Sequence, residues 1–189
     1  MIPTIHIPNT GHPWSTVYAV AAADIPESWL LTGGLMVQLH AITGGLTARP
    51  TTDADLLADL MTDRRGIARL RSILATRGFE TQPGTLTGYT TRMSTPNGDV
   101  VDLLVADHLP KFLGADHAGY GDRHLYDAAM LASLIPDPDT ELTRLHSGTD
   151  RKRIRLLHDK LTEDSPYWNN LDESHRQDGL DTIETLATW

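Results

Sequence analysis

The chain has 189 residues, of which 40% are hydrophobic and 22% are charged, as is ordinary for a globular protein with a sizeable core. It contains no cysteine, which excludes disulfides and thiolate metal sites, and no apolar run approaches the ~18 residues of a membrane span. The net charge of −9 disfavours general binding of duplex nucleic acid, but a local arginine patch with metal ions is still compatible with a nucleotide or an RNA end. We expect one domain, with or without a small helical appendage, without a signal peptide and in the cytoplasm.

The first part of the chain alternates between helical and strand patterns. Apolar or alternating runs predict strands at residues 29–32, 52–57, 79–81, 89–94 and 100–105. Apolar residues at helical spacing predict helices at residues 15–23, 36–42 and 64–77. Ser15 is placed to cap the first of these helices, and the pairs Gly33-Gly34 and Gly44-Gly45 bound the second. Pro96-Asn97-Gly98 predicts a turn that joins the last two strands in a hairpin.

The remainder of the chain is predicted to be helical after an irregular interval at residues 107–122. One helix is expected at 124–134, one begins after Ser147 or Thr149, and the last spans 173–187. The fold class is therefore α/β in the α+β sense, with a mixed β-sheet flanked by helices and a helical C-terminal region. We expect residues 1–110 to form the core and residues 111–189 to pack against it as one unit.

Three aspartates occupy positions where strand patterns predict them side by side. Asp53 and Asp55 are one residue apart on a predicted strand, so both side chains project from the same face. Their mutual repulsion would be relieved by divalent cations, and an all-oxygen ligand set favours Mg²⁺ or Mn²⁺ with substrate phosphates. Asp102 lies inside the apolar run VVDLL, where an unpaired charge is costly. If its strand neighbours that of Asp53 and Asp55, the three converge on one site.

Each of these features also has a purely structural interpretation. A lone D-x-D pair often caps a turn and faces water. Asp102 could instead pair with Arg92 across the predicted hairpin, and Gly33-Gly34 could be only a strand-to-helix turn. The combination is more specific than its parts, because glycines that open a helix leave its N–H groups available to phosphate shortly before the carboxylates.

The same residues carry a family resemblance. The strings LLTGG-LMVQLH, ARPTTDADLL and DVVDLLV resemble nucleotidyltransferases of the DNA polymerase β superfamily, and most of all AbiE-type and MenA/MenT-like toxin nucleotidyltransferases. Aminoglycoside nucleotidyltransferases share a similar layout, a glycine pair followed by R-x-x-x-D-x-D. The resemblance covers about residues 29–106 and returns at RHLYDAAMLASL, residues 123–134.

The resemblance implies a role for two sets of residues. Metal binding and catalysis are assigned to Asp53, Asp55 and Asp102. Nucleotide binding is assigned to Gly33, Gly34, Arg49, Thr51, Thr52, Lys111 and Asp127. Relatives usually carry a lysine between the third carboxylate and the helical R-x-x-x-D segment, where this chain has only Lys111, so its role is kept at a shifted spacing, lost, or taken by arginine. Asp127 is equally well a surface charge or a partner for Arg123.

The leading hypothesis is a Mg²⁺- or Mn²⁺-dependent enzyme that transfers a nucleoside monophosphate from an NTP to an acceptor hydroxyl, releasing pyrophosphate. The resemblance implies a toxin-like enzyme with an RNA acceptor such as tRNA, or a protein acceptor, and with a cognate antitoxin as a candidate partner. The arginines at 64–71 and 151–155 are the first candidates for phosphate contacts. Two alternatives stay open: a non-catalytic nucleotide- or partner-binding member of the fold, and an enzyme acting on a small cationic acceptor of the aminoglycoside kind.

Overall fold

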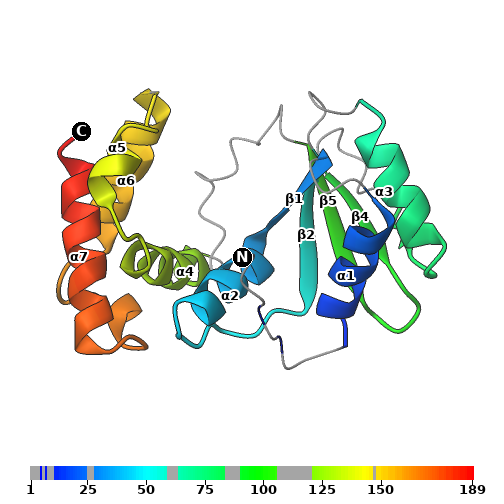
Figure 1. The fold of residues 1–189 in the computed structure, drawn as a ribbon, viewed down its shortest axis with the longest axis horizontal. Coiled ribbons are helices and arrows are strands. Elements are labelled where there is room, and N and C mark those ends of the chain that lie inside the picture. The colour runs from blue at the N-terminus through cyan, green and yellow to red at the C-terminus, as the bar shows by residue number, and fades with distance from the viewer. Residues whose placement is uncertain are drawn as a thin grey trace. The chain divides into compact units, whose positions relative to one another are not determined.

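The structure, a computed structural model, describes residues 5, 7, 11–24, 28–58, 64–83, 90–105, 121–146 and 148–189. Within these residues, α-helices and one five-stranded mixed sheet form an α+β fold (Figure 1), which confirms the predicted class. The chain divides into two compact units, described in turn: the first unit is Met1–Gln38 with Arg49–Ala115, and the second is Leu39–Ala48 with Asp116–Trp189. None of the helices in the described residues combines the length and the apolar character needed to cross a membrane.

The first unit is built on the sheet. Its strands are β1 (Trp29–Thr32), β2 (Asp53–Ala58), β3 (Glu80–Thr81), β4 (Thr90–Ser94) and β5 (Val100–Val105). They lie in the order β1-β2-β5-β4-β3, with β2 and β5 parallel and every other neighbouring pair antiparallel; Figure 1 labels the first four strands of this order. This register places Asp55 of β2 and Arg92 of β4 on either side of Asp102 in β5. The predicted strands are therefore present, within a residue or two of their expected ends.

One face of the sheet is apolar and is covered by helices α1 (Trp14–Ala23) and α3 (Gly66–Ala75) (Figure 1). Helix α1 contacts α3 and β2, and α3 contacts β5. The central strands bury these side chains completely on that face: Ala54, Leu56, Ala58, Val101 and Leu103. Because successive strand residues point to opposite sides, Asp53, Asp55 and Asp102 project from the other face.

Helix α2 (Gly33–Thr43) follows β1 without an intervening loop. It begins at Gly33, so the glycine pair opens the helix as predicted, and the helix extends beyond the predicted residues 36–42. The predicted end is confirmed: Gly45 has a φ of +75°, and the Leu46 N–H donates to the Ala41 carbonyl at 2.7 Å, as in a left-handed C-terminal cap. The glycines therefore fix both ends of α2.

The second unit is helical. Its elements are α4 (Gly121–Ser133), α5 (Pro138–Leu142), α6 (Gly148–Lys160), the 3-10 helix η4 (Pro166–Trp168) and α7 (Glu173–Ala187). Buried Ala129, Ala132, Leu161, Trp168 and Ile183 form its core. The Trp168 indole N–H donates to the Thr162 carbonyl at 3.0 Å, so this core residue leaves no polar atom unsatisfied. Helix α7 has the predicted bounds, whereas α5 and η4 were not predicted.

Several predicted helix ends are wrong. Helix α1 begins at Trp14 with Pro13 in the capping position and no side-chain cap, so Ser15 lies inside the helix. Packing explains the difference, because Trp14 is buried and its indole N–H donates to Gln38 Oε1 at 3.2 Å. Helix α3 covers fewer residues than the predicted 64–77. Thr149 likewise lies within α6 rather than before it, and Ser147 lies outside the described residues.

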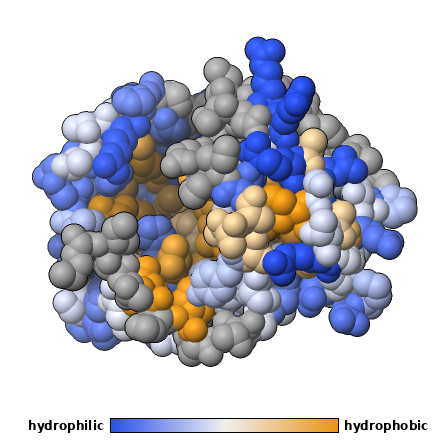
Figure 2. Space-filling model, turned by 45° about the vertical axis from the view of Figure 1, so that its right-hand side comes forward, coloured by the Kyte–Doolittle hydropathy of each residue, from blue (hydrophilic) through white to orange (hydrophobic). Residues whose placement is uncertain are grey.

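Apolar residues are mostly withdrawn from the surface. In Figure 2, hydrophilic residues cover most of the visible face and hydrophobic residues show between them. Tyr18, Leu30 and Leu156 are the large hydrophobic residues that are exposed among those described. Isolated exposed hydrophobic residues of this kind are normal for a globular fold and do not mark a site.

Candidate metal centre

The three predicted carboxylates come together on the sheet of the first unit. Asp53, Asp55 and Asp102 each offer an oxygen, and these oxygens lie within 4.8 Å of one another. Parallel pairing of β2 with β5 produces the cluster, because it sets Asp55 opposite Asp102 and the strand repeat brings Asp53 to the same face. Asp102 is buried and the other two are half-buried. No other group of acidic or histidine side chains among the described residues is comparably placed for a metal.

Arg92 lies beside the cluster and binds one member of it. Its Nε donates to Asp102 Oδ1 at 2.8 Å and its terminal nitrogen Nη2 donates to Asp102 Oδ2 at 2.6 Å, a two-pronged geometry that only arginine provides. These hydrogen bonds to Asp102 raise the pKa of Arg92 above its ordinary value; burial opposes the shift, and the charges of Asp102, Asp53 and Asp55 add to it. The predicted Arg92–Asp102 pair is thus confirmed, and it coexists with the carboxylate cluster.

The glycine pair that opens α2 lies against the carboxylates. A Cβ added to Gly33 would overlap Oδ2 of Asp55, and one added to Gly34 would lie 2.8 Å from Oγ1 of Thr51. The same Thr51 hydroxyl donates to Asp53 Oδ1 at 2.7 Å. Gly33 also has a φ of +62°, in the left-handed region that glycine enters at little cost. The start of α2, the loop before β2 and the carboxylates therefore form one contiguous site.

The structure connects the remaining predicted nucleotide-binding residues less directly to the carboxylate cluster. The Arg49 carbonyl accepts a hydrogen bond from Gln38 Nε2 at 2.9 Å, which ties the approach to β2 onto α2, and Thr52 is exposed. Asp127 is half-buried on α4, in the second unit. Lys111 lies outside the described residues. The predicted nucleotide-binding roles of these residues remain predictions.

His12 is a residue near the site that sequence reasoning missed. Its Nδ1 lies 2.9 Å from the Thr16 hydroxyl. Its Nε2 lies 3.1 Å from the carbonyl oxygen and 3.3 Å from the amide nitrogen of Val100. Because Val100 is the first residue of β5, His12 fixes that strand two residues before Asp102. His12 precedes the first predicted helix, and a single histidine there gave no periodicity or spacing that could have revealed this contact.

Comparison with models of known protein families and with curated proteins gives no match. The resemblance of the motifs to nucleotidyltransferases therefore stays a hypothesis.

Proposed function

We propose that the chain is a Mg²⁺- or Mn²⁺-dependent nucleotidyltransferase that transfers a nucleoside monophosphate from an NTP to an acceptor hydroxyl. The observation that carries the proposal is the convergence of Asp53, Asp55 and Asp102 within 4.8 Å, directly against Gly33 at the start of α2. Carboxylates on adjacent strands beside a helix N-terminus supply the two things that a nucleoside triphosphate needs, which are cation ligands and N–H donors for phosphate.

The donor set suits a small divalent cation. All three ligands are carboxylate oxygens, the type that Mg²⁺ and Mn²⁺ prefer. The single guanidinium of Arg92 against three carboxylates leaves two formal negative charges among these four side chains, which match one divalent cation. Bound cations of this kind supply Lewis-acid polarisation of the α-phosphate and neutralise charge on the departing pyrophosphate.

The chain's own residues then have separable roles. Asp53 and Asp55 would hold the cation, and the backbone N–H groups at Gly33 and Gly34 would orient the triphosphate. The acceptor oxygen forms a bond to the α-phosphorus, the bond to the bridging oxygen breaks, and pyrophosphate leaves. Both oxygens of Asp102 already accept hydrogen bonds from Arg92, so we assign Asp102 to cation binding and the proton of the acceptor hydroxyl to solvent.

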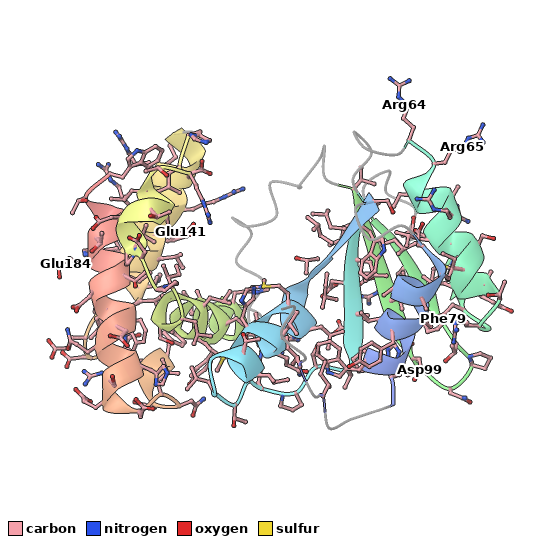
Figure 3. All side chains as sticks on the ribbon, viewed as in Figure 1. Arg64, Arg65, Phe79, Asp99, Glu141 and Glu184 are labelled. Atoms are coloured by element: carbon pink, nitrogen blue, oxygen red, sulfur yellow. The ribbon has the colours of Figure 1, made fainter. Side chains whose placement is uncertain are left out.

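Among the candidate acceptors, RNA is supported by the exposed face of α6. The exposed cations of this helix are Arg151, Lys152, Arg153, Arg155 and Lys160. None of them forms an ion pair with another described residue, and Arg151 lies 5.0 Å above the centre of the Trp189 ring. In the first unit, Arg64 and Arg65 project outward just before α3 (Figure 3). The cations of α6, which have no ion-pair partner among the described residues, lie on an acidic chain and favour a phosphate backbone over a cationic small molecule.

The first experiment measures transfer directly. The full chain is incubated with each α-labelled NTP, Mg²⁺ or Mn²⁺, and total tRNA, with a protein mixture and an aminoglycoside in parallel as acceptors. We expect labelled tRNA with the wild type and a loss of at least about 100-fold with Asp53→Ala. Equal labelling by the Asp53→Ala variant would rule the proposal out. Nucleotide and metal binding without transfer to any acceptor would favour the non-catalytic alternative.

The second experiment tests the RNA acceptor. A variant with Arg151→Gln, Lys152→Gln and Arg155→Gln removes three unpaired cations. We expect tRNA affinity to fall and the slope of log affinity against log salt to flatten by roughly two to three. A matched control is Arg144→Gln, whose guanidinium is paired with Glu141 at 2.7 Å. If the control weakens binding as much as the triple variant, α6 is not the RNA-binding face.

A further inference from the structure

We infer that Arg92 is an internal counter-ion of the carboxylate cluster and competes with the metal cation for it, so that Arg92 limits how tightly the cluster binds a divalent ion. This inference rests on the proposed function, because it concerns the same three carboxylates. It assigns to Arg92 a role in setting metal affinity that is distinct from supporting the fold.

The geometry places Arg92 where a cation would otherwise bind. Register sets Arg92 on β4 opposite Asp102 on β5, on the same face of the sheet as Asp53 and Asp55. It donates to both oxygens of Asp102, at 2.8 and 2.6 Å. A metal ion that takes Asp102 as a ligand must therefore share an oxygen that already accepts a guanidinium N–H.

Arg92 is also the more exposed partner of the pair. Its side chain is 45% exposed, whereas that of Asp102 is 10% exposed. Asp102 lies in the central part of β5, which is paired on one side with β2 and on the other with β4. Removal of the guanidinium therefore takes away a positive charge without freeing the carboxylate to turn elsewhere.

The charges around Arg92 also favour competition between Arg92 and a metal cation. The guanidinium of Arg92 contacts Asp102 on the face of the sheet that also carries Asp53 and Asp55, so it is attracted by all three carboxylates. By the same interactions, Arg92 lowers the attraction that the cluster exerts on any other cation. A residue that only positions Asp102 would have the opposite effect, because its loss would weaken metal binding.

The test is a calorimetric titration of the full chain with Mn²⁺ at constant ionic strength and pH. The variants are Arg92→Gln, Arg92→Lys and the matched control Arg77→Gln, which removes one exposed positive charge from the same unit. We expect Arg92→Gln to bind Mn²⁺ about 10-fold more tightly than the wild type. Arg92→Lys should fall between them, and Arg77→Gln should match the wild type. Unchanged or weaker binding by Arg92→Gln would overturn the inference.

Thermal unfolding with and without Mn²⁺ covers the case in which Arg92→Gln folds poorly without metal, since an unpaired buried carboxylate is destabilising. We expect Mn²⁺ to raise the Tm of Arg92→Gln by more than it raises that of the wild type. A smaller or equal rise would contradict the competition. If wild-type protein binds no Mn²⁺, the proposed function itself fails; if the wild type binds and Arg92→Gln binds no better, only the role of Arg92 fails.

Discussion

The two units differ in whether they bury charged side chains. The first unit has Asp102 buried on its sheet beside two half-buried aspartates, and it encloses Asp24 in an ion pair with Arg69. In the described part of the second unit, the buried polar side chains are the hydroxyls of Ser133, Ser165 and Thr182. None of the acidic side chains described in this unit is fully buried: Glu184 is exposed (Figure 3), whereas Asp127 and Glu141 are half-buried.

The buried hydroxyls and the clustered carboxylates differ in their cost to stability. Hydroxyls satisfied by nearby backbone, such as Ser133 donating to the Met130 carbonyl at 2.8 Å, cost a core little. Clustered carboxylates cost a great deal unless they are paired or bind cations. Packing among the described residues of the first unit does not require three of them on one face, and the metal binding proposed above would account for their placement. Four substitutions test this contrast.

The largest expected effect comes from Gly33→Ala. The new Cβ would overlap the Asp55 carboxylate and the residue would keep a φ of +62°, so we expect a loss of about 2–4 kcal/mol of unfolding free energy. Gly45→Ala is the control, because its φ is +75° but nothing lies within 4 Å of an added Cβ. It should lose only about 1 kcal/mol. Denaturant unfolding measures both, and equal losses would mean that the Asp55 contact is not tight.

Gly179→Ala is the corresponding test in the second unit. An added Cβ would lie 2.6 Å from Cζ3 of Trp168, so the core must open, and we expect a loss of about 1–3 kcal/mol. Gly148→Ala, which has nothing within 4 Å of the new atom, should be neutral. Mn²⁺ affinity should not change in either variant, since the cluster belongs to the other unit. A change in affinity would show that the units do not behave separately.

Asp53→Asn is expected to raise stability slightly in metal-free protein. The amide keeps an oxygen for the Thr51 hydroxyl, which donates to Asp53 Oδ1 at 2.7 Å, and it removes one of three clustered negative charges. We expect a gain of about 0.5–1 kcal/mol in the presence of EDTA. When Mn²⁺ is added, the wild type should become more stable than Asp53→Asn, because only the wild type keeps all three carboxylate ligands. Destabilisation by Asp53→Asn in EDTA would indicate that the cluster is structural.

The smallest effect is expected from a helix cap in the second unit. The backbone N–H of His175, and then its side chain, hydrogen-bond to Asp172 and lower the pKa of this carboxyl. A lowered pKa means that the charged cap stabilises the protein above the unfolded pKa and that this contribution is lost as the pH falls through the folded pKa. Asp172→Asn should therefore lower Tm by about 2 °C at neutral pH. This difference should narrow below about pH 4, and a constant difference would contradict the assignment.

The sheet and its cluster were predictable because their patterns are local and strict. Asp53 and Asp55 had to share a face once their segment was a strand. Asp102 stood out as the one charge in the apolar run from Val100 to Val105, and the turn at 96–98 brought Arg92 opposite it. The residues of β2 and β5 do not show by themselves that the two strands are neighbours. The sequence could therefore predict the three-carboxylate site only on the condition that they pair.

Other features depended on contacts between distant segments. The start of α1 follows burial of Trp14 rather than the capping ability of Ser15, because core packing outweighs a single cap. The contact of His12 with β5 joins residues 88 apart in the chain, and no local pattern predicts such a contact. Short elements such as α5 were missed because five residues carry too few positions to show a helical period.

The overlap between Gly33 and Asp55 also has a consequence for how this protein can vary. A side chain at position 33 and a carboxylate at position 55 exclude each other in space, so the two positions should be epistatic. In a deep mutational scan of double variants, substitutions at 33 should be tolerated mainly in backgrounds where 55 is small, and those backgrounds should lack the proposed metal binding. Variation at this helix start is therefore expected to be coupled to variation of the carboxylate beside it.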